Sequence, residues 1–262
     1  MRTLRSPRSR STARQHLKSR AGAAPAEHFN LDQLEPRVLL TGYAPEEVLL
    51  LDLINAVRAD PQAEAARLGV DLNAGLTFQQ IALIGPKEPL AFSDTLLDTA
   101  QGHSADMFAR GFLDFINPDG QDGQDRADAA GYDGDVRELL AGGFADPDAL
   151  LTEWLSAPST RADLLSLDPN FRPEFRPTEF GAARVIPPAG ANDPFGAYWT
   201  ALTGIRDVER NSFGERIGTP PTHALGVAYE DANGNGRYDQ DEGLAEVTIT
   251  IVAPATPHPV HN

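Results

Sequence analysis

Apolar residues recur at helical spacing in the part of the chain that follows the first 44 residues. The first such stretch begins at Pro45, and Leu50, Ile54 and Val57 fall on one stripe of it. Pro61 is expected to end or kink this helix, because proline lacks the backbone N–H that a helix interior requires. The pattern therefore predicts one amphipathic helix that is followed by a second, shorter one.

A further periodic stretch begins at Ser93, a residue type that is common at helix N-caps. Leu96, Ala100 and Met107 recur at helical spacing, and His103 lies among them. We therefore expect a helix that begins at this serine and places one imidazole on its inward face. Shorter helices are expected over 122–131, from 147 through Trp154, and over 160–167.

The periodicity changes toward strands in the last third of the chain. Residues 179–186 and 195–203 flank a loop of Pro, Gly, Ala and Asn, which predicts an antiparallel pair. Two further strand candidates, 224–230 and 245–253, bracket an acidic, glycine-rich loop. Helices followed by strands are typical of an α+β fold in which helices cover a sheet.

The charge of the N-terminus differs from that of the rest of the chain. The first 20 residues carry seven of the 22 Lys and Arg residues and no acidic one, whereas the remainder carries 15 against 38 Asp and Glu, a net charge of −23. A body this acidic repels phosphate backbones, which argues against a nucleic-acid partner, and favours cations such as calcium. The same charge also serves solubility. With no cysteine in the chain, a disulfide framework and a thiol nucleophile are excluded.

The N-terminal part of the chain has no uninterrupted apolar run that could span a membrane, so we expect no transmembrane segment. The residues Leu-Glu-Pro-Arg-Val-Leu-Leu at 34–40 resemble the LEPRxLL element found near the N-termini of large surface or exported proteins of planctomycete-type bacteria. That resemblance implies export. The predicted division is a disordered basic leader with this element over 1–44, a main domain over 45–204, a linker over 205–222, a β-hairpin over 223–253 and a disordered tail over 254–262.

Several short motifs in the main domain resemble, in their order and spacing, a bacterial CAP domain. This superfamily contains cysteine-rich secretory proteins, antigen 5 and plant pathogenesis-related proteins, and its bacterial members are also called SCP-like. The resemblance implies an α/β/α sandwich, with a central antiparallel sheet between helical layers, and an extracellular or cell-surface setting. The motifs are Leu53-x-Asn55-x-x-Arg58, His103-Ser104-x-Asp106-Met107, Asn117-Pro118-Asp119-Gly120 with Arg126 and Ala130-Gly131-Tyr132, Trp154-x-x-x-Pro158-x-x-Arg161, and Tyr198-Trp199-Thr200.

Members of this family present two histidines and two carboxylates in a central cavity, a set that can hold a divalent metal. Matched position by position, the histidines fall on Phe115 and Thr160, and one carboxylate falls on Glu138. For the second carboxylate the nearest candidate is Glu153. Phenylalanine cannot coordinate a metal, and threonine is a poor replacement for imidazole, so a histidine-bound metal is not expected in this cavity. The resemblance therefore favours a non-catalytic binding module whose extracellular or cell-surface ligand is unknown.

Two alternatives remain open at this stage. A hydrolase, such as a metal-assisted protease, could use a rearranged site formed by His103, Glu138 and Glu179. A lipid-binding protein could use an apolar groove. A histidine on an apolar helix face is more often a hydrogen-bonded core residue, and the chain contains no other catalytic motif, such as Gly-x-Ser-x-Gly or His-Glu-x-x-His.

The acidic loop between the last two strand candidates fits the twelve-position calcium-loop template. Glycine is present at position six, where that template needs a sharp turn, and calcium prefers the hard oxygen ligands that the other positions offer. The flanking strands resemble the opening of a B-type module of serine-aspartate-repeat adhesins, which implies a structural Ca²⁺ site. Its expected ligands are the side chains of Asp231, Asn233, Asn235, Asp239 and Glu242 and the backbone carbonyl of Arg237.

Overall fold

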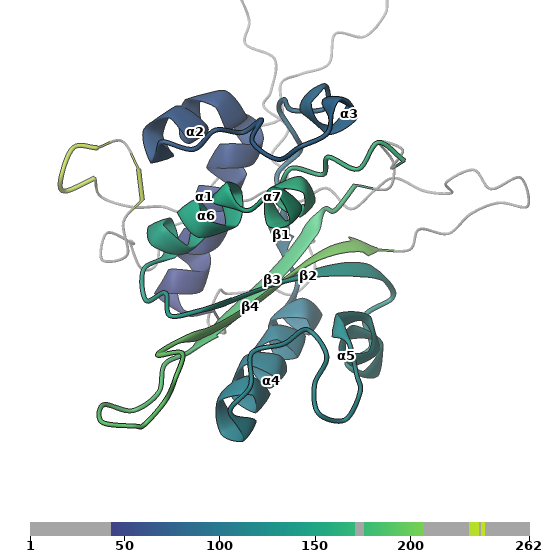
Figure 1. The fold of residues 1–262 in the computed structure, drawn as a ribbon, viewed down its shortest axis with the longest axis vertical. Helices are drawn as coiled ribbons and strands as arrows, with labels where there is room; N and C mark the ends of the chain where they lie inside the picture. Colours follow the sequence, from purple (N-terminus) through teal and green to yellow (C-terminus); the bar gives the residue numbers. More distant parts are fainter. Residues whose placement is uncertain (1–42, 171–175, 207–230, 236, 239–262) are drawn as a thin grey trace, which may run out of the picture. The chain divides into compact units, whose positions relative to one another are not determined.

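The computed structural model describes residues 43–170, 176–206, 231–235 and 237–238, all within one unit that spans 38–247. Its centre is a four-stranded sheet with helices on both faces (Figure 1). The helices are α1 Pro45–Ala59, α2 Pro61–Leu68, α3 Phe78–Ile81, α4 Asp94–Arg110, α5 Gly123–Ala129, α6 Pro147–Ser156 and α7 Pro158–Leu164. The strands are β1 Ala91–Phe92, β2 Gly134–Gly142, β3 Glu179–Val185 and β4 Tyr198–Arg206.

The strands lie in the order β1-β3-β4-β2. β3 and β4 form the antiparallel pair that the sequence predicts, and Glu179 lies opposite Gly204 at one end of it. β2 pairs antiparallel with β4, and Glu138 lies opposite Leu202. The two-residue strand β1 runs parallel to β3, so one edge departs from a purely antiparallel sheet. The predicted α+β fold, with its sheet between helical layers, is confirmed.

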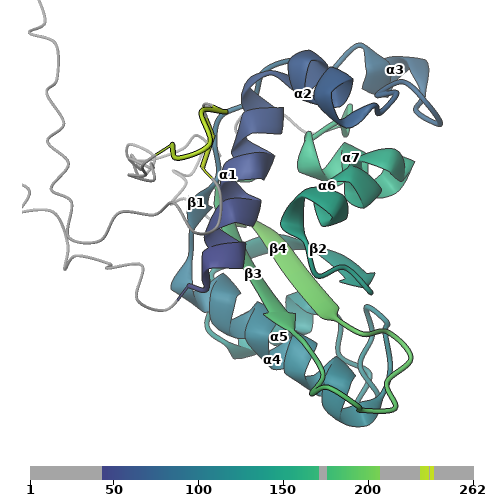
Figure 2. The same ribbon diagram turned by 90° about the vertical axis from the view of Figure 1, so that its left-hand side faces the viewer.

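One face of the sheet is covered by α1, α6 and α7, with α2 beside α1 (Figure 2). The larger core lies here. Ile54 and Val57 of α1 are each 1% exposed, and Trp154 of α6 packs in the same cluster as Trp199 of β4. The apolar stripe of the first predicted helix is therefore its core face. Burying a side chain of this size contributes about 2 kcal/mol.

The opposite face is covered by α4 and α5. Leu96 and Ala100 of α4 are fully buried against Leu202 of β4. Ser93 precedes α4 as its N-cap residue, but its side chain makes no capping hydrogen bond. Its backbone N–H donates instead to the carbonyl of Phe180 in β3, so the start of α4 is tied to the sheet.

The sequence prediction missed β1 and β2, so strands do not simply follow helices along the chain. β2 carries Arg137 and Glu138 at adjacent positions, and each faces a different layer. Charged side chains held by ion pairs on both faces remove the apolar–polar alternation by which a strand is normally recognised. The predicted helix over 160–167 begins earlier, at Pro158, and ends at Leu164.

Two residues of the CAP-like motifs, Asn55 and Arg58, hold segments of the fold together by buried or partly buried hydrogen bonds. Asn55 pairs with the backbone of Leu90, donating to its carbonyl at 3.0 Å and accepting from its N–H at 2.8 Å. The buried guanidinium of Arg58 donates to the carbonyls of Glu88 and Leu164, at 2.9 and 2.7 Å. Buried charged donors of this kind must be hydrogen-bonded to be tolerated. These two residues therefore fasten α1 to the segments that lead into β1 and out of α7.

None of the helices among the described residues is long and apolar enough to cross a membrane.

Candidate functional site

His103 is 1% exposed on the inward side of α4. Its Nε2 lies 3.0 Å from the backbone oxygen of Asp114, so in the hydrogen-bonded state Nε2 carries the proton and donates it. Burial, reinforced by the nearby positive charge of Arg126, lowers the pKa of His103 to about 4. The imidazole is therefore a neutral, packed group at physiological pH.

Glu138 extends from β2 toward α5, where Arg126 lies. Nη2 of Arg126 is 2.7 Å from each carboxylate oxygen of Glu138, and both side chains are largely buried, at 10% and 5% exposure. Burial raises the pKa of Glu138, while the Arg126 charge and hydrogen bonds act in the opposite direction. Arg126 also donates to the carbonyls of Phe115 and Gln121, at 3.0 and 2.6 Å. It thus joins α5, β2 and the loop after α4.

Glu179 does not join this cluster. It begins β3 opposite Gly204 and is 4% exposed. Glu138 lies on β2, with β4 between the two carboxylates. Arg126 pairs with Glu138 and its charge also acts on His103, whereas Glu179 lies two strands away from Glu138.

The other positions matched to the family's cavity are also spread out. The backbone carbonyl of Phe115 contacts Arg126 on the α5 side, as described above. Thr160 begins α7 in the opposite layer, where its hydroxyl donates to the carbonyl of Trp154 at 2.5 Å, and Glu153 is exposed on α6. Within the described residues, no three His, Asp or Glu side chains are grouped so as to hold a metal ion.

The lowered pKa of His103 predicts a specific pH dependence of stability. Above pH 6.5 the imidazole is neutral in both the folded and the unfolded chain. As the pH falls from 6.5 to about 4, the imidazole becomes protonated in the unfolded chain but stays neutral in the folded chain, so the folded state loses stability. We expect this site to remove about 3 kcal/mol of stability across that window. His103→Gln, which keeps a donor for Asp114, should lose less stability between pH 7 and pH 4 in urea unfolding. Equal losses in the two proteins would contradict the assignment.

Part of the predicted calcium loop is described. The side-chain oxygens of Asp231 and Asn233 both accept from the backbone N–H of Asn235, each at 2.9 Å, so two of the expected ligands converge on one point. The side-chain oxygen of Asn235 accepts from the backbone N–H of Arg237 at 2.7 Å. Two other expected ligands, Asp239 and Glu242, lie outside the described residues, as do the strands predicted on either side.

The end of this loop contacts the helical layer. Arg237 pairs with Glu64 of α2, whose side chain is 8% exposed. Glu64 also forms an ion pair with Arg67 at 2.7 Å. Arg67 in turn donates bidentate hydrogen bonds to the carboxylate of Asp148 in α6, at 2.9 and 3.1 Å. Tyr238 is 6% exposed and belongs to the larger core. A chain of ion pairs and one buried ring therefore link the loop to α2 and α6.

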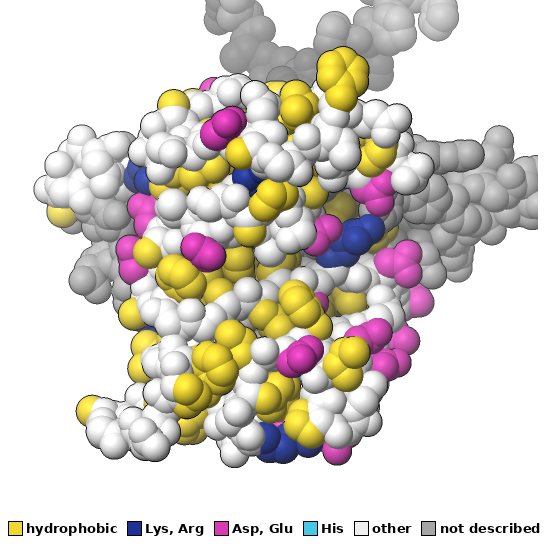
Figure 3. Space-filling model, viewed as in Figure 1, with side chains coloured by type: hydrophobic (Ala, Val, Ile, Leu, Met, Phe, Trp, Pro, Cys, Tyr) yellow, Lys and Arg dark blue, Asp and Glu magenta, His cyan; other side chains and the backbone are white. Residues whose placement is uncertain are grey.

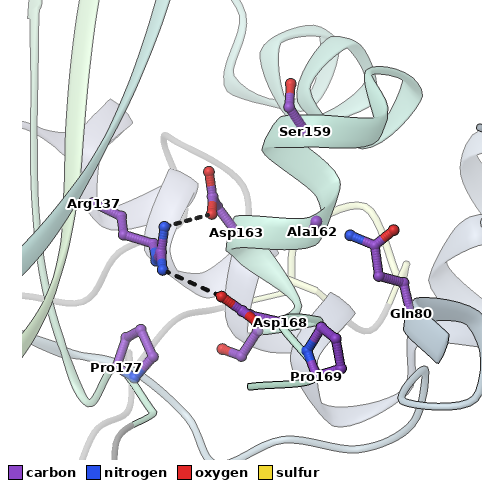
Figure 4. A pocket seen from close by; sticks show the side chains of 9 residues that line it. Gln80, Arg137, Ser159, Ala162, Asp163, Asp168, Pro169 and Pro177 are labelled. Carbon is purple, nitrogen blue, oxygen red and sulfur yellow. Dashed lines mark ion pairs between the residues drawn. The ribbon is translucent and has the colours of Figure 1, made fainter. Parts of the chain in front are cut away.

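Arg137 and two aspartates line a cavity between β2 and α7, with a volume of about 360 Å³. Arg137 reaches toward Asp163 of α7 and toward Asp168, at 3.6 and 3.7 Å (Figure 4). In the space-filling view of the face drawn in Figure 1, acidic side chains are numerous along the right-hand side (Figure 3). The cavity is lined by Gln80, Arg137, Ser159, Ala162, Asp163, Ser166, Asp168, Pro169 and Pro177.

Sequence reasoning missed this cavity because it did not recognise β2 as a strand. Once β2 is known, Arg137 must face the layer opposite to Glu138, since consecutive side chains of a strand alternate. Asp163 then faces the strand from α7. The signal available in the sequence was the adjacent pair of opposite charges at 137 and 138.

No family model and no curated protein matches the chain. Among solved structures, an outer surface protein from Borrelia burgdorferi is similar, with 19% identity, a TM-score of 0.39, and coverage of 60% of this chain and 90% of that one. An extracellular protein containing an SCP domain from Bacillus anthracis has the same identity and TM-score, over 60% of this chain and 39% of that one. A cysteine-rich secretory protein from Staphylococcus aureus has 14% identity and a TM-score of 0.37, over 63% and 40%.

This chain spans about two fifths of the length of the last two structures. All three TM-scores are below 0.5. The fold of the described residues is an α/β/α sandwich. A buried Arg–Glu pair lies on one face of its sheet, and a separate cavity that contains Arg137 lies on the other face.

Proposed function

We propose that this chain is an exported or cell-surface protein of the CAP type that acts by binding, not by catalysis, and that its C-terminal loop binds a structural calcium ion. The order of the CAP-like motifs and the layered fold support the family. The observation that carries the non-catalytic assignment is the Glu138–Arg126 pair.

A general acid or base must reach the proton that it transfers. Glu138 is the clearest match to the family's cavity carboxylates, and both of its oxygens are engaged by Arg126. His103 is buried and hydrogen-bonded to the backbone, and Glu179 lies two strands from Glu138. This arrangement favours a structural role for all three residues over the hydrolase alternative.

The cavity beside α7 contains Arg137 in its lining, and a second cavity, beside the described part of the loop, contains Arg67 and Asp148. A lipid chain would require an apolar groove instead. The charged side chains in both linings support a ligand that carries polar groups.

The described part of the loop fits a calcium ion. Asp231, Asn233 and Asn235 supply hard oxygens at positions one, three and five, which Ca²⁺ prefers. The guanidinium of Arg237 forms an ion pair with Glu64, so its positive charge is not directed at the expected calcium ligands. When bound, the ion would hold the loop in a fixed conformation.

We expect calcium titration of the full chain by calorimetry to show one ion bound per chain, with a Kd of about 1 mM or tighter. Asp231→Asn removes a charged ligand and should weaken binding at least tenfold. Asp98→Asn, an exposed aspartate of α4 in the opposite layer, is the matched control and should leave the Kd unchanged. Absence of calcium binding to the wild-type chain, or equal binding by the wild type and Asp231→Asn, would contradict the site.

Export has its own test. Fractionation of the producing cells should recover the full chain outside the cytoplasm. Replacing residues 34–40 by alanine should retain the chain inside, because these residues form the LEPRxLL-like element. Recovery of the wild-type chain in the cytoplasmic fraction alone would contradict export.

A further inference from the structure

We propose that Asn233 is a site of spontaneous deamidation, in which the backbone nitrogen of Gly234 attacks its side-chain amide, and that the carboxylate formed adds a negative charge to the expected calcium ligands. The first part of this inference depends on the geometry of residues 231–235, and the second part rests on the calcium site proposed above. In the sequence an asparagine precedes a glycine at two places, 233–234 and 235–236.

The attacking group is the backbone nitrogen of Gly234. Within the described part of the chain this nitrogen donates no hydrogen bond, whereas most backbone N–H groups of a fold have a partner. Gly234 has a φ of 72°, a conformation that favours glycine, and no atom lies within 4 Å of a Cβ built there. Residues 231–235 are exposed, so water and hydroxide reach the nitrogen, and glycine has no side chain to hinder the attack.

The side-chain amide of Asn233 is polarised for this attack. Its Oδ1 accepts a hydrogen bond from the backbone N–H of Asn235 at 2.9 Å, and the same N–H also donates to Asp231 at 2.9 Å. As the nitrogen of Gly234 adds to Cγ, negative charge develops on Oδ1, and a donor already directed at that oxygen stabilises the charge. The reacting groups belong to adjacent residues, so little entropy is lost in bringing them together.

The reaction exchanges an amide for a carboxylate and needs only water and hydroxide. The nitrogen of Gly234 gives its proton to hydroxide and bonds to Cγ of Asn233. The Cγ–Nδ2 bond breaks, and the departing NH2 group takes a proton from water and leaves as ammonia. Water then opens the cyclic succinimide and returns a proton to the nitrogen. Addition of water at Cγ gives aspartate, and addition at the main-chain carbonyl carbon gives isoaspartate, in which the chain continues through the side chain.

The two products have opposite effects on the proposed calcium site. Aspartate at 233 would place a second carboxylate in the loop, at position three, close to Asp231 at position one. Calcium affinity in such loops depends on the charge of the ligands, so this product should bind the ion more tightly. Isoaspartate lengthens the backbone and moves its carboxylate, so this product should bind the ion less tightly. The calcium affinity of the loop would therefore change as the chain ages.

The first test follows the folded full chain by mass spectrometry of its tryptic peptide 217–237 during incubation at about pH 8 and about pH 6. We expect Asn233 to become aspartate and isoaspartate, faster at the higher pH because the nitrogen attacks in its deprotonated form. Asn73, an exposed asparagine that precedes an alanine, is the internal control and should remain an amide. The folded chain should react at 233 at least as fast as the chain unfolded in urea, because the folded loop holds the Asn235 donor on Oδ1.

Gly234→Asp introduces a residue type that tolerates the left-handed region but places a side chain next to the attacking nitrogen. It should slow the reaction at 233 about tenfold. The matched control is Gly69→Asp, at an exposed glycine with a φ of 69° where a built Cβ also meets no atom within 4 Å, and it should leave the rate unchanged. The first part is overturned if Asn233 stays an amide or reacts more slowly in the folded chain than in urea. Modification confined to Asn235, an equal rate at Asn73, or an equal rate in Gly234→Asp would also overturn it.

The second test measures calcium binding by calorimetry with Asn233→Asp, which reproduces the aspartate product. Its Kd should be about fivefold lower than that of the wild type. Asn73→Asp adds the same charge outside the loop and should leave the Kd unchanged. An equal Kd for the wild type and Asn233→Asp would overturn the second part. If neither protein binds calcium, the calcium site and the second part both fail, whereas the mass spectra still decide whether Asn233 is modified.

Discussion

Gly181→Ala is expected to destabilise the fold by about 3 kcal/mol or more. Gly181 lies in β3 directly beneath the first turn of α4. A Cβ atom built at this position would be 2.2 Å from the carbonyl carbon of Leu96 and 2.3 Å from the backbone nitrogen of Leu97. Backbone atoms cannot rotate aside as a flexible side chain can, so α4 would have to move away from the sheet.

The matched control is Gly102→Ala in the middle of α4. No atom lies within 4 Å of a Cβ built there, and alanine favours a helix over glycine by about 1 kcal/mol. This variant should therefore be equal to the wild type or slightly more stable in urea unfolding. If Gly181→Ala were as stable as Gly102→Ala, the close packing of α4 on β3 would be wrong.

Arg126→Met is expected to cost about 3–5 kcal/mol, because it leaves the buried carboxylate of Glu138 without its partner. Adding Glu138→Gln removes the unpaired charge, so the double variant should recover part of that loss. Urea unfolding of the wild type, both single variants and the double variant gives the coupling between the two residues. Additive losses would contradict the buried pair.

The pH dependence provides an independent check on the same pair. Without Arg126, the pKa of Glu138 should rise further, because burial then acts unopposed. A carboxyl whose folded pKa is raised costs stability where the unfolded chain is ionised, and this cost falls as the pH drops. The loss in free energy of unfolding caused by Arg126→Met should thus be larger at pH 7 than at pH 4.5. A deficit that does not change between these pH values would argue that Glu138 is already solvated.

Local pattern was sufficient to predict the long helices α1 and α4. The stripe formed by Leu96, Ala100 and Met107 predicted α4, and the inward position of His103 followed from the same spacing. The pair of β3 and β4 also followed from local signals. In each case the residues that decide the element are neighbours in sequence, and one face of the element is apolar.

The polar interior could not be predicted in this way. Glu138 was identified by its match to the family, but its partner Arg126 comes from α5, and the match gives no contact between them. Arg237 and Glu64 are separated by 173 positions, and nothing in either segment points to the other. Ion pairs between distant segments depend on how the layers are stacked, which periodicity does not encode.

We propose that the loop over 231–242 binds calcium, and its described end is joined to the α/β/α domain through Arg237 and Tyr238. Trp154 and Trp199 are the two tryptophans of the chain, and both are buried in the larger core that also contains Tyr238. Tryptophan fluorescence during heating therefore reports unfolding of the domain and not of the loop alone. Calcium binding at the loop should raise this unfolding temperature, because an ion that binds only the folded state stabilises it.

The most direct measurement is thermal unfolding of the full chain, followed by tryptophan fluorescence, with and without saturating calcium. A concentration about 100 times the Kd should add about 3 kcal/mol of stability and raise the unfolding temperature by several degrees in the wild type. Asp231→Asn should show no such rise. An unfolding temperature that calcium leaves unchanged in the wild type, or raises equally in Asp231→Asn, would contradict the account.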